Sequence, residues 1–151
     1  MTSDVTRAAR VLVVDDNKDV VELLELLLTH HGLDVLKAYG GQESLELIRC
    51  EPVDLVVLDV MMPGTDGLTV SRELKRDYPS LPIILLTARD DMSTRSEAMS
   101  LGVSEFVTKP VDNHDLLMRI QTQLRNREWE QEMDLVDSTV EANAKRSGLP
   151  K

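Results

Sequence analysis

The sequence predicts an α/β fold in which helices cover both faces of a parallel sheet. Short apolar runs alternate with amphipathic stretches five times along the chain, which is typical of strands joined by helical crossovers. The run from Leu55 to Leu58 is apolar throughout and is bounded by turn residues, as expected of a strand buried on both faces. Several runs end on polar residues, and these ends meet at the edge of the sheet where ligands bind in open α/β folds.

Composition narrows the class of protein. The chain has 151 residues, enough for one domain and a short appendage, and its 42% hydrophobic content supports a core. Because only 3% of the residues are aromatic, that core is aliphatic. The net charge of −10 argues against direct binding of nucleic acid, since few cations are available to neutralise phosphates. Cys50 is the single cysteine, which excludes an intramolecular disulfide and a cysteine-based metal site.

Targeting signals and membrane spans are not expected. No run reaches the roughly 18–20 apolar residues that a transmembrane helix needs. The polar start, residues 1–10, lacks the apolar segment of a signal peptide. We therefore expect a cytoplasmic protein without membrane contact.

The first two strand–helix pairs are marked by their caps. A strand over residues 10–14 is followed by Asn17, a favourable helix N-cap, and by apolar residues at helical spacing up to Leu28. Gly32 stands at a C-cap position after His30 and His31. A second strand over residues 33–38 leads through a glycine turn into a helix over residues 42–49, which Pro52 stops.

The remaining three pairs follow the same order. The third strand covers residues 55–59, and after a loop that contains Pro63, Gly64 and Gly67 a helix covers residues 68–77. The fourth strand and helix are expected over residues 82–87 and 91–101, with Gly102 as the C-cap. A short fifth strand over residues 105–108 precedes a helix from residue 112 to about 125.

Four segments follow from these assignments. Residues 1–9 are expected to be a disordered lead, 10–125 one domain, 126–146 a helical extension and 147–151 a disordered end. The extension carries one apolar edge at four-three-four spacing, formed by Trp129, Met133, Val136 and Val140. It is either a solvated continuation or a stalk that pairs with itself or joins an output domain.

Five polar residues from four segments are expected to meet where the strands end: Asp15, Asp16, Asp59, Thr87 and Lys109. Taken singly, each has an ordinary structural explanation such as a turn acid, a cap or a solvated charge. Together, three carboxylates repel one another unless a cation joins them, and oxygen ligands suit Mg²⁺. The backbone carbonyl of Met61 could complete that site.

The same set of groups suits phosphoryl transfer. A metal, the Lys109 ammonium and the Thr87 hydroxyl around Asp59 would cradle a phosphoryl group bound to that carboxylate, which would act as the nucleophile. The three histidines, His30, His31 and His114, have no spacing that pairs them as ligands.

Four segments carry a family resemblance: Val11-Leu12-Val13-Val14-Asp15-Asp16, Leu58-Asp59-Val60-Met61-Met62-Pro63-Gly64-Thr65-Asp66-Gly67, Leu86-Thr87-Ala88 and Val107-Thr108-Lys109-Pro110. In this order the segments resemble the receiver domain of two-component response regulators, over residues 9 to 125. The resemblance implies a flavodoxin-like (βα)₅ fold with sheet order 2-1-3-4-5. It also implies Asp59 as the phosphoacceptor, Mg²⁺ held by Asp15 and Asp16, and Lys109 in contact with the phosphoryl oxygens.

The resemblance assigns further roles. Thr87 and Phe106 would form the switch, the hydroxyl moving to the phosphoryl group while the aromatic ring turns inward. Met61 and Arg89, each two residues beyond a site residue, would tune the lifetime of the phosphoryl group, and this bulky and cationic pair predicts slow self-hydrolysis. The Lys109–Pro110 peptide would be cis.

The implied partner is a sensor histidine kinase or a histidine phosphotransfer protein, and the chain would be a signalling switch rather than an enzyme. A homodimer is possible through the fourth helix, fifth strand and fifth helix or through the C-terminal helix. An aspartyl phosphatase of the haloacid dehalogenase type would need a second Asp where Met61 stands. Two alternatives stay open: a phosphate-independent interaction or dimerisation domain, and the N-terminal receiver of a larger multidomain regulator.

Overall fold

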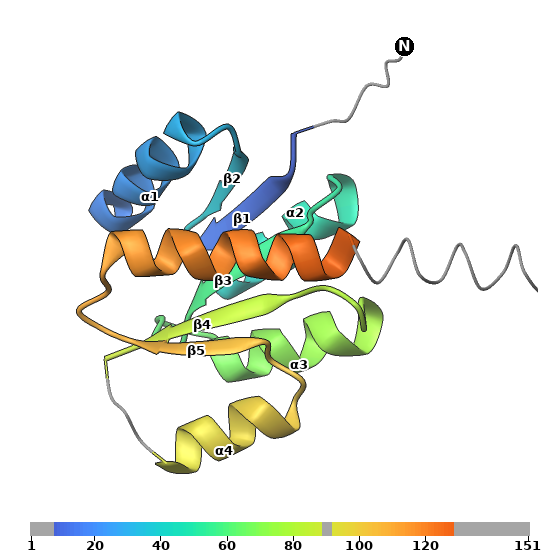
Figure 1. Cartoon of the computed structure of the whole chain (residues 1–151). Coiled ribbons are helices and arrows are strands. Elements are labelled where there is room, and N and C mark those ends of the chain that lie inside the picture. Colours follow the sequence, from blue (N-terminus) through green and yellow to red (C-terminus); the bar gives the residue numbers. More distant parts are fainter. Residues whose placement is uncertain (1–7, 89–91, 129–151) are drawn as a thin grey trace, which may run out of the picture.

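The computed structural model describes residues 8–88 and 92–128. Five parallel strands form one sheet in the order β2-β1-β3-β4-β5 (Figure 1). The strands are β1 (Arg10–Val14), β2 (Asp34–Ala38), β3 (Leu55–Asp59), β4 (Ile83–Thr87) and β5 (Glu105–Thr108). The helices are α1 (Lys18–His30), α2 (Gly41–Cys50), α3 (Gly67–Asp77), α4 (Met92–Ser100) and a further helix over residues 113–128. This is the doubly wound α/β fold that the sequence predicts.

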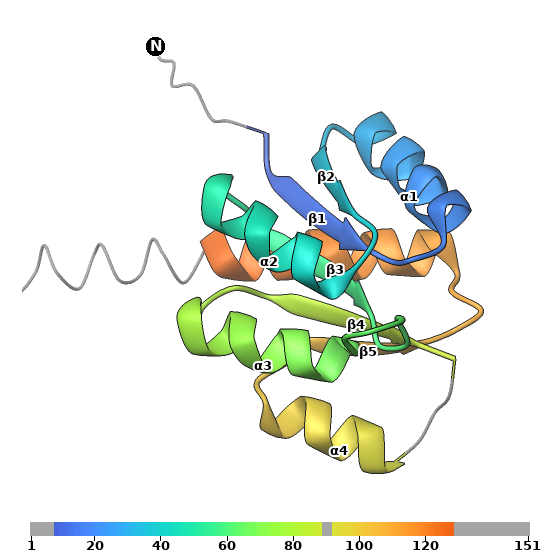
Figure 2. The ribbon, with the colours of Figure 1, turned by 180° about the vertical axis from the view of Figure 1, so that it is seen from behind.

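Helices cover both faces of the sheet. The α1 helix and the 113–128 helix lie on one face (Figure 1), and α2, α3 and α4 lie on the other (Figure 2). Alternate residues of the same strands therefore enter different cores: Val57 packs with α1 and the 113–128 helix, whereas Val56 and Leu58 pack with the other three helices. Because each side of the central strands meets a helix, β3 and β4 are buried at every position.

The strand order places two carboxyl ends side by side. Strand β1 pairs with both β2 and β3, so the chain reverses its direction of winding between these neighbours. The register aligns Val14 of β1 with Leu58 of β3. The residues that follow, Asp15 and Asp59, therefore emerge at the same level of the sheet edge, which is where ligands bind in open α/β folds.

Local signals at the helix ends agree with the global fold. The side chain of Asn17 caps α1 by accepting hydrogen bonds from two backbone N–H groups, and the side chain of Asp66 caps α3 by accepting one, from Thr69. After α1, Gly32 has a φ of +83°. The N–H of Gly32 donates a hydrogen bond to the backbone carbonyl of Thr29, and the N–H of Leu33 donates one to the backbone carbonyl of Leu28. This is a Schellman ending, which a glycine adopts without steric cost.

Several boundaries differ from the predicted ones by one or two residues. The last helix continues beyond the predicted domain end near residue 125, and residues 126–128, the first of the predicted helical extension, are helical. The side chain of Arg127 donates a hydrogen bond to the carbonyl of Val53 at 3.1 Å and lies 3.5 Å from the Asp54 carboxylate. These contacts with the two residues that precede β3 hold this turn of the helix on the domain.

Both ends of the chain lie largely outside the described residues. Of the predicted lead over residues 1–9, only residues 8 and 9 are described. The apolar edge from Trp129 to Val140 and the end segment over residues 147–151 lie wholly outside the described residues. The division into four segments therefore stays a prediction.

The Lys109–Pro110 peptide is cis, as the resemblance implies. Within residues 8–88 and 92–128, no helix combines the length and the apolar character needed to cross a bilayer.

Replacing Gly32 tests the α1 ending. Gly32→Ala is expected to lower the free energy of unfolding by about 1–2 kcal/mol, because a Cβ disfavours the left-handed backbone conformation there while nothing within 4 Å would clash with it. Gly32→Asn should cost less, since asparagine tolerates this conformation better. Urea unfolding of both variants measures the difference, and equal losses would contradict a conformational origin.

Candidate functional site

Asp59 lies at the last position of β3 and is 4% exposed. Its Oδ1 atom accepts a hydrogen bond from the backbone N–H of Met61 at 3.3 Å. The Nζ atom of Lys109 lies 3.4 Å from the same oxygen. The carboxylate is thus buried beside the sheet edge and is held from two sides.

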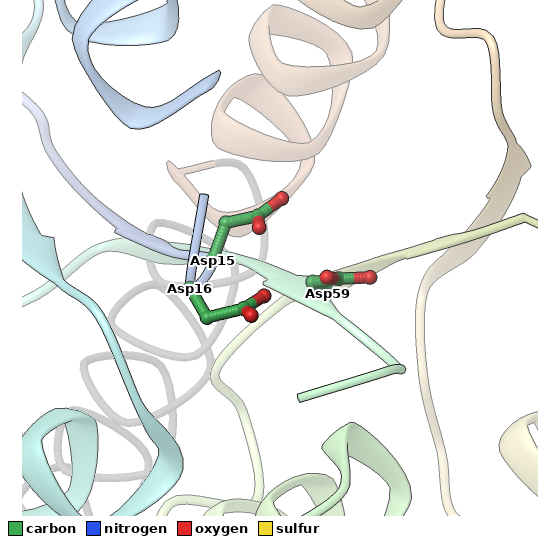
Figure 3. A group of neighbouring side chains, drawn as sticks. All are labelled: Asp15, Asp16 and Asp59. Carbon is green, nitrogen blue, oxygen red and sulfur yellow. The ribbon is translucent and has the colours of Figure 1, made fainter. Parts of the chain in front are cut away.

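Asp15 and Asp16 follow β1 directly. Asp15 is 2% exposed, and its Oδ1 atom accepts a hydrogen bond from the N–H of Asn17 at 3.0 Å, while Asp16 is exposed. One oxygen from each of Asp15, Asp16 and Asp59 lies within 4.8 Å of the others (Figure 3). Three carboxylates from two adjacent strands therefore gather in a volume that a single cation could occupy.

Lys109 follows β5 and provides a positive charge beside these acids. Its backbone N–H donates to the carbonyl of Thr87 at 2.6 Å, which fixes the start of the loop against β4. Its Nζ atom lies 3.4 Å from Asp15 Oδ2 and 3.4 Å from Asp59 Oδ1. One ammonium group thus faces two buried carboxylates, and negative charge remains in excess.

The pKa of Asp59 reflects this excess. Burial raises the pKa of its carboxyl above the ordinary value, and the neighbouring charge of Asp15 raises it further. Lys109 and the N–H of Met61 act in the opposite direction but do not cancel these effects. A hard divalent cation would relieve the repulsion, because carboxylate oxygens are its preferred ligands and the exposed Asp16 leaves a side open to water.

The two predicted switch residues lie on neighbouring strands. Thr87 is the last residue of β4 and is 3% exposed, and it pairs in register with Thr108 of β5. Phe106 is half-buried on β5, where it packs against the core on the α2–α4 side. The guanidinium of Arg95 from α4 lies over the Phe106 ring at 5.2 Å, within the range of a cation–π interaction.

The two predicted lifetime residues have different outcomes. The Met61 side chain is 69% exposed beside the site, whereas its N–H binds Asp59. Arg89 lies outside the described residues.

Sequence reasoning missed two contributions to the site. Asn17 was expected only as a helix cap, but its backbone N–H also binds Asp15. Gly67 was expected only as a loop glycine, but its N–H donates to the carbonyl of Val60 at 2.8 Å, directly after the central carboxylate. The sequence signals the contact between Gly67 and Val60 only through the spacing of Gly67, which stands eight residues after Asp59.

Comparisons with known proteins agree with this geometry. A family model described as "Response regulator receiver domain" matches residues 11–121. The chain is similar to a CheY-like receiver domain protein from Methanospirillum hungatei JF-1, with 25% identity and a TM-score of 0.80 over 82% of this chain and 99% of that one.

Two further solved structures extend the comparison. A receiver domain protein from Clostridium thermocellum is 31% identical, with a TM-score of 0.75 over 80% of this chain and 98% of that one. NtrX from Brucella abortus, solved in complex with ADP, is 28% identical with a TM-score of 0.78, but the match covers 85% of this chain and only 30% of that one.

Asp59→Asn is expected to stabilise the protein in the absence of divalent cations. The raised pKa means that the folded state disfavours the ionised carboxylate, so its contribution to stability is lost as pH rises through the folded pKa. At about pH 7 the variant should gain about 0.5–2 kcal/mol, as is common when a destabilising functional group is removed. Urea unfolding should show this gain shrinking toward about pH 4, and a variant less stable than the parent at neutral pH would contradict it.

Proposed function

The chain belongs to the response regulator receiver domains of two-component signalling, and on that premise we propose that it is a switch controlled by phosphorylation of Asp59. The observation that carries the proposal is the buried position of this carboxylate between Lys109 and the two acids after β1. Receiver domains are signalling switches rather than enzymes that turn over a separate substrate. The output is then a change in binding and not a product.

The proposed reaction uses Asp59 as the nucleophile. A carboxylate oxygen attacks the phosphorus of the donor, a P–O bond forms, and the bond from phosphorus to the donor nitrogen or oxygen breaks. The leaving group departs with that electron pair and takes up a proton. Lys109, 3.4 Å from the carboxylate, would neutralise charge on the phosphoryl oxygens and orient them.

Mg²⁺ is the cation that we propose for the site. Asp15, Asp16 and Asp59 would hold it, with the carbonyl of Met61 as a further ligand. When bound, Mg²⁺ supplies charge neutralisation between the carboxylates and the incoming phosphoryl group. The chain's own contribution is to keep Asp15 in place through the N–H of Asn17 and to leave Asp16 exposed toward solvent.

Thr87 and Phe106 are proposed as the relay from the site to the surface. Thr87 ends the strand beside Asp59, and Phe106 lies on the next strand beneath Arg95 of α4. Movement of the Thr87 hydroxyl toward a phosphoryl group would open space for the ring. The ring would then leave Arg95, and the surface of α4, β5 and the 113–128 helix would change.

The proposed partners follow from this chemistry. A sensor histidine kinase or a histidine phosphotransfer protein would supply the phosphoryl group, and a second copy of the chain could bind the surface of α4, β5 and the 113–128 helix. The short coverage of NtrX favours one further possibility, that such a domain forms part of a longer regulator. A phosphate-independent interaction domain is the alternative, and it accounts less well for a complete set of acids and lysine.

Intact mass measures the proposed function directly. After incubation with Mg²⁺ and a small phosphodonor, the parent should gain the mass of one phosphoryl group and Asp59→Asn none, because the nucleophile is absent. Asp34→Asn is a matched control, since that acid lies at the opposite end of the sheet and should leave phosphorylation intact. A folded, Mg²⁺-binding parent that gains no mass would favour the phosphate-independent alternative.

The lifetime of the phosphoryl group tests the role of Met61. This apolar side chain beside Asp59 should hinder an attacking water molecule. In the Met61→Asn variant we therefore expect the aspartyl phosphate to be hydrolysed about tenfold faster, which corresponds to a barrier lower by roughly 1.4 kcal/mol. Arg89→Ala should change the rate in the same direction. The decay of the phosphorylated mass after removal of the donor gives each rate. Decay rates equal to that of the parent in both variants would contradict a role of Met61 and Arg89 in the lifetime of the phosphoryl group.

A further inference from the structure

Gly67, the first residue of α3, lies against the peptide that joins Asp59 to Val60. A Cβ atom added at this glycine would stand 2.5 Å from the carbonyl oxygen of Asp59 and 2.7 Å from the Cα of Val60. Both distances are far shorter than van der Waals contact. Gly67 does not have a positive φ, so the requirement for glycine here is one of space rather than of conformation.

Neither side of this contact can move freely. On one side, Asp66 caps α3 through the N–H of Thr69, and Val70 and Leu74 anchor the helix in the core. On the other side, the N–H of Val60 donates to the carbonyl of Leu86 at 2.8 Å, which ties the end of β3 to β4. The atoms that a side chain would strike are backbone atoms, which cannot turn aside as the tip of a flexible side chain can.

We propose that Gly67 is a positioning residue for Asp59. Its lack of a side chain allows the start of α3 to press directly on the backbone of the carboxylate, and its N–H, donated to Val60 at 2.8 Å, holds that backbone at the level of Asp15 and Lys109. This inference rests on the proposed function, because it concerns the geometry of the same carboxylate. A side chain at Gly67 would displace Asp59 from the other acids and from the Lys109 ammonium.

The expected effect is larger on the site than on the fold. Displacement of a reacting group by about 1 Å can cost about 100-fold in rate, and loss of a supporting contact typically costs about 10–100-fold in metal affinity or activity. Gly67→Ala should therefore bind Mg²⁺ at least about tenfold more weakly and accept a phosphoryl group at least about tenfold more slowly.

Gly41 offers a matched control from the same molecule. It is also the first residue of a helix, α2, and a Cβ added there would stand 2.8 Å from Val70 Cγ2 and 3.0 Å from Thr65 Cβ. These are side-chain atoms, and none belongs to Asp59. Gly41→Ala should thus strain the packing between α2 and α3 while Mg²⁺ affinity stays close to that of the parent.

The experiment compares the parent, Gly67→Ala and Gly41→Ala in three measurements: Mg²⁺ affinity by calorimetry, phosphorylation rate by intact mass, and stability by urea unfolding. Selective loss of Mg²⁺ affinity in Gly67→Ala, at a stability similar to that of Gly41→Ala, supports the proposal. Equal Mg²⁺ affinity in parent and Gly67→Ala overturns it, whatever the change in stability. If the parent binds Mg²⁺ but takes up no phosphoryl group, the proposed function fails while the Mg²⁺ comparison still decides the role of Gly67.

A second variant applies if Gly67→Ala does not fold. Asp66→Ala removes the cap that holds the first turn of α3 and adds no atom near Asp59. Weaker Mg²⁺ binding in this variant would support the role of the α3 start, and unchanged binding would overturn it.

Discussion

The structure depends on an imbalance of charge at one edge of its sheet. Two buried carboxylates, Asp15 and Asp59, share the single ammonium group of Lys109 at 3.4 Å each. Burial and repulsion from Asp15 raise the pKa of Asp59, so the ionised carboxylate is less favourable in the folded state than in the unfolded chain. The two aliphatic cores on either side of the sheet supply the stability that makes this arrangement tolerable, since each fully buried aliphatic side chain contributes about 1.5–3 kcal/mol. An unfavourable site of this kind is suited to a cation, which would offset the excess negative charge of the carboxylates.

The strand order determines which acids meet. Because β1 and β3 are neighbours and are aligned from Val14 to Leu58, the residues that follow them lie at one level. Lys109 reaches the same place from the end of β5, where its backbone N–H binds the carbonyl of Thr87 on the strand between. The site is therefore built mainly by backbone pairing, and side chains contribute the chemistry. Small changes in that backbone, such as those expected from an atom added at Gly67, would be transmitted to every distance in the site.

Much of this could be predicted from the sequence because it depends on short-range patterns. Five apolar runs with helical stretches between them predict the sheet, and acids at strand ends predict the edge where they gather. The contacts that could not be predicted depend on distances between elements that are far apart in the chain. The approach of Gly67 to Asp59 requires the angle between β3 and α3, and the hydrogen bond from Arg127 to the carbonyl of Val53 requires the last helix to lie beside the segment that precedes β3. No periodicity in one segment encodes either distance.

The opposite edge of the sheet shows why an acidic cluster alone does not indicate a functional site. There, Arg10 binds Asp34 at 2.6 Å and Glu51 at 3.0 Å, and both acids are 47% exposed. The hydrogen bond from Arg10 to Asp34 raises the pKa of the guanidinium, so the ionised pair is favoured and water screens the charge that remains. At the Asp59 end of the strands, Asp15 and Asp59 are almost fully buried, and the shift in the pKa of Asp59 disfavours ionisation of its carboxyl. Both ends of the strands bring acids together with one basic residue, but only the acids at the Asp59 end include two buried carboxylates, and this difference in burial separates an exposed ion-pair cluster from a group of acids that could hold a cation.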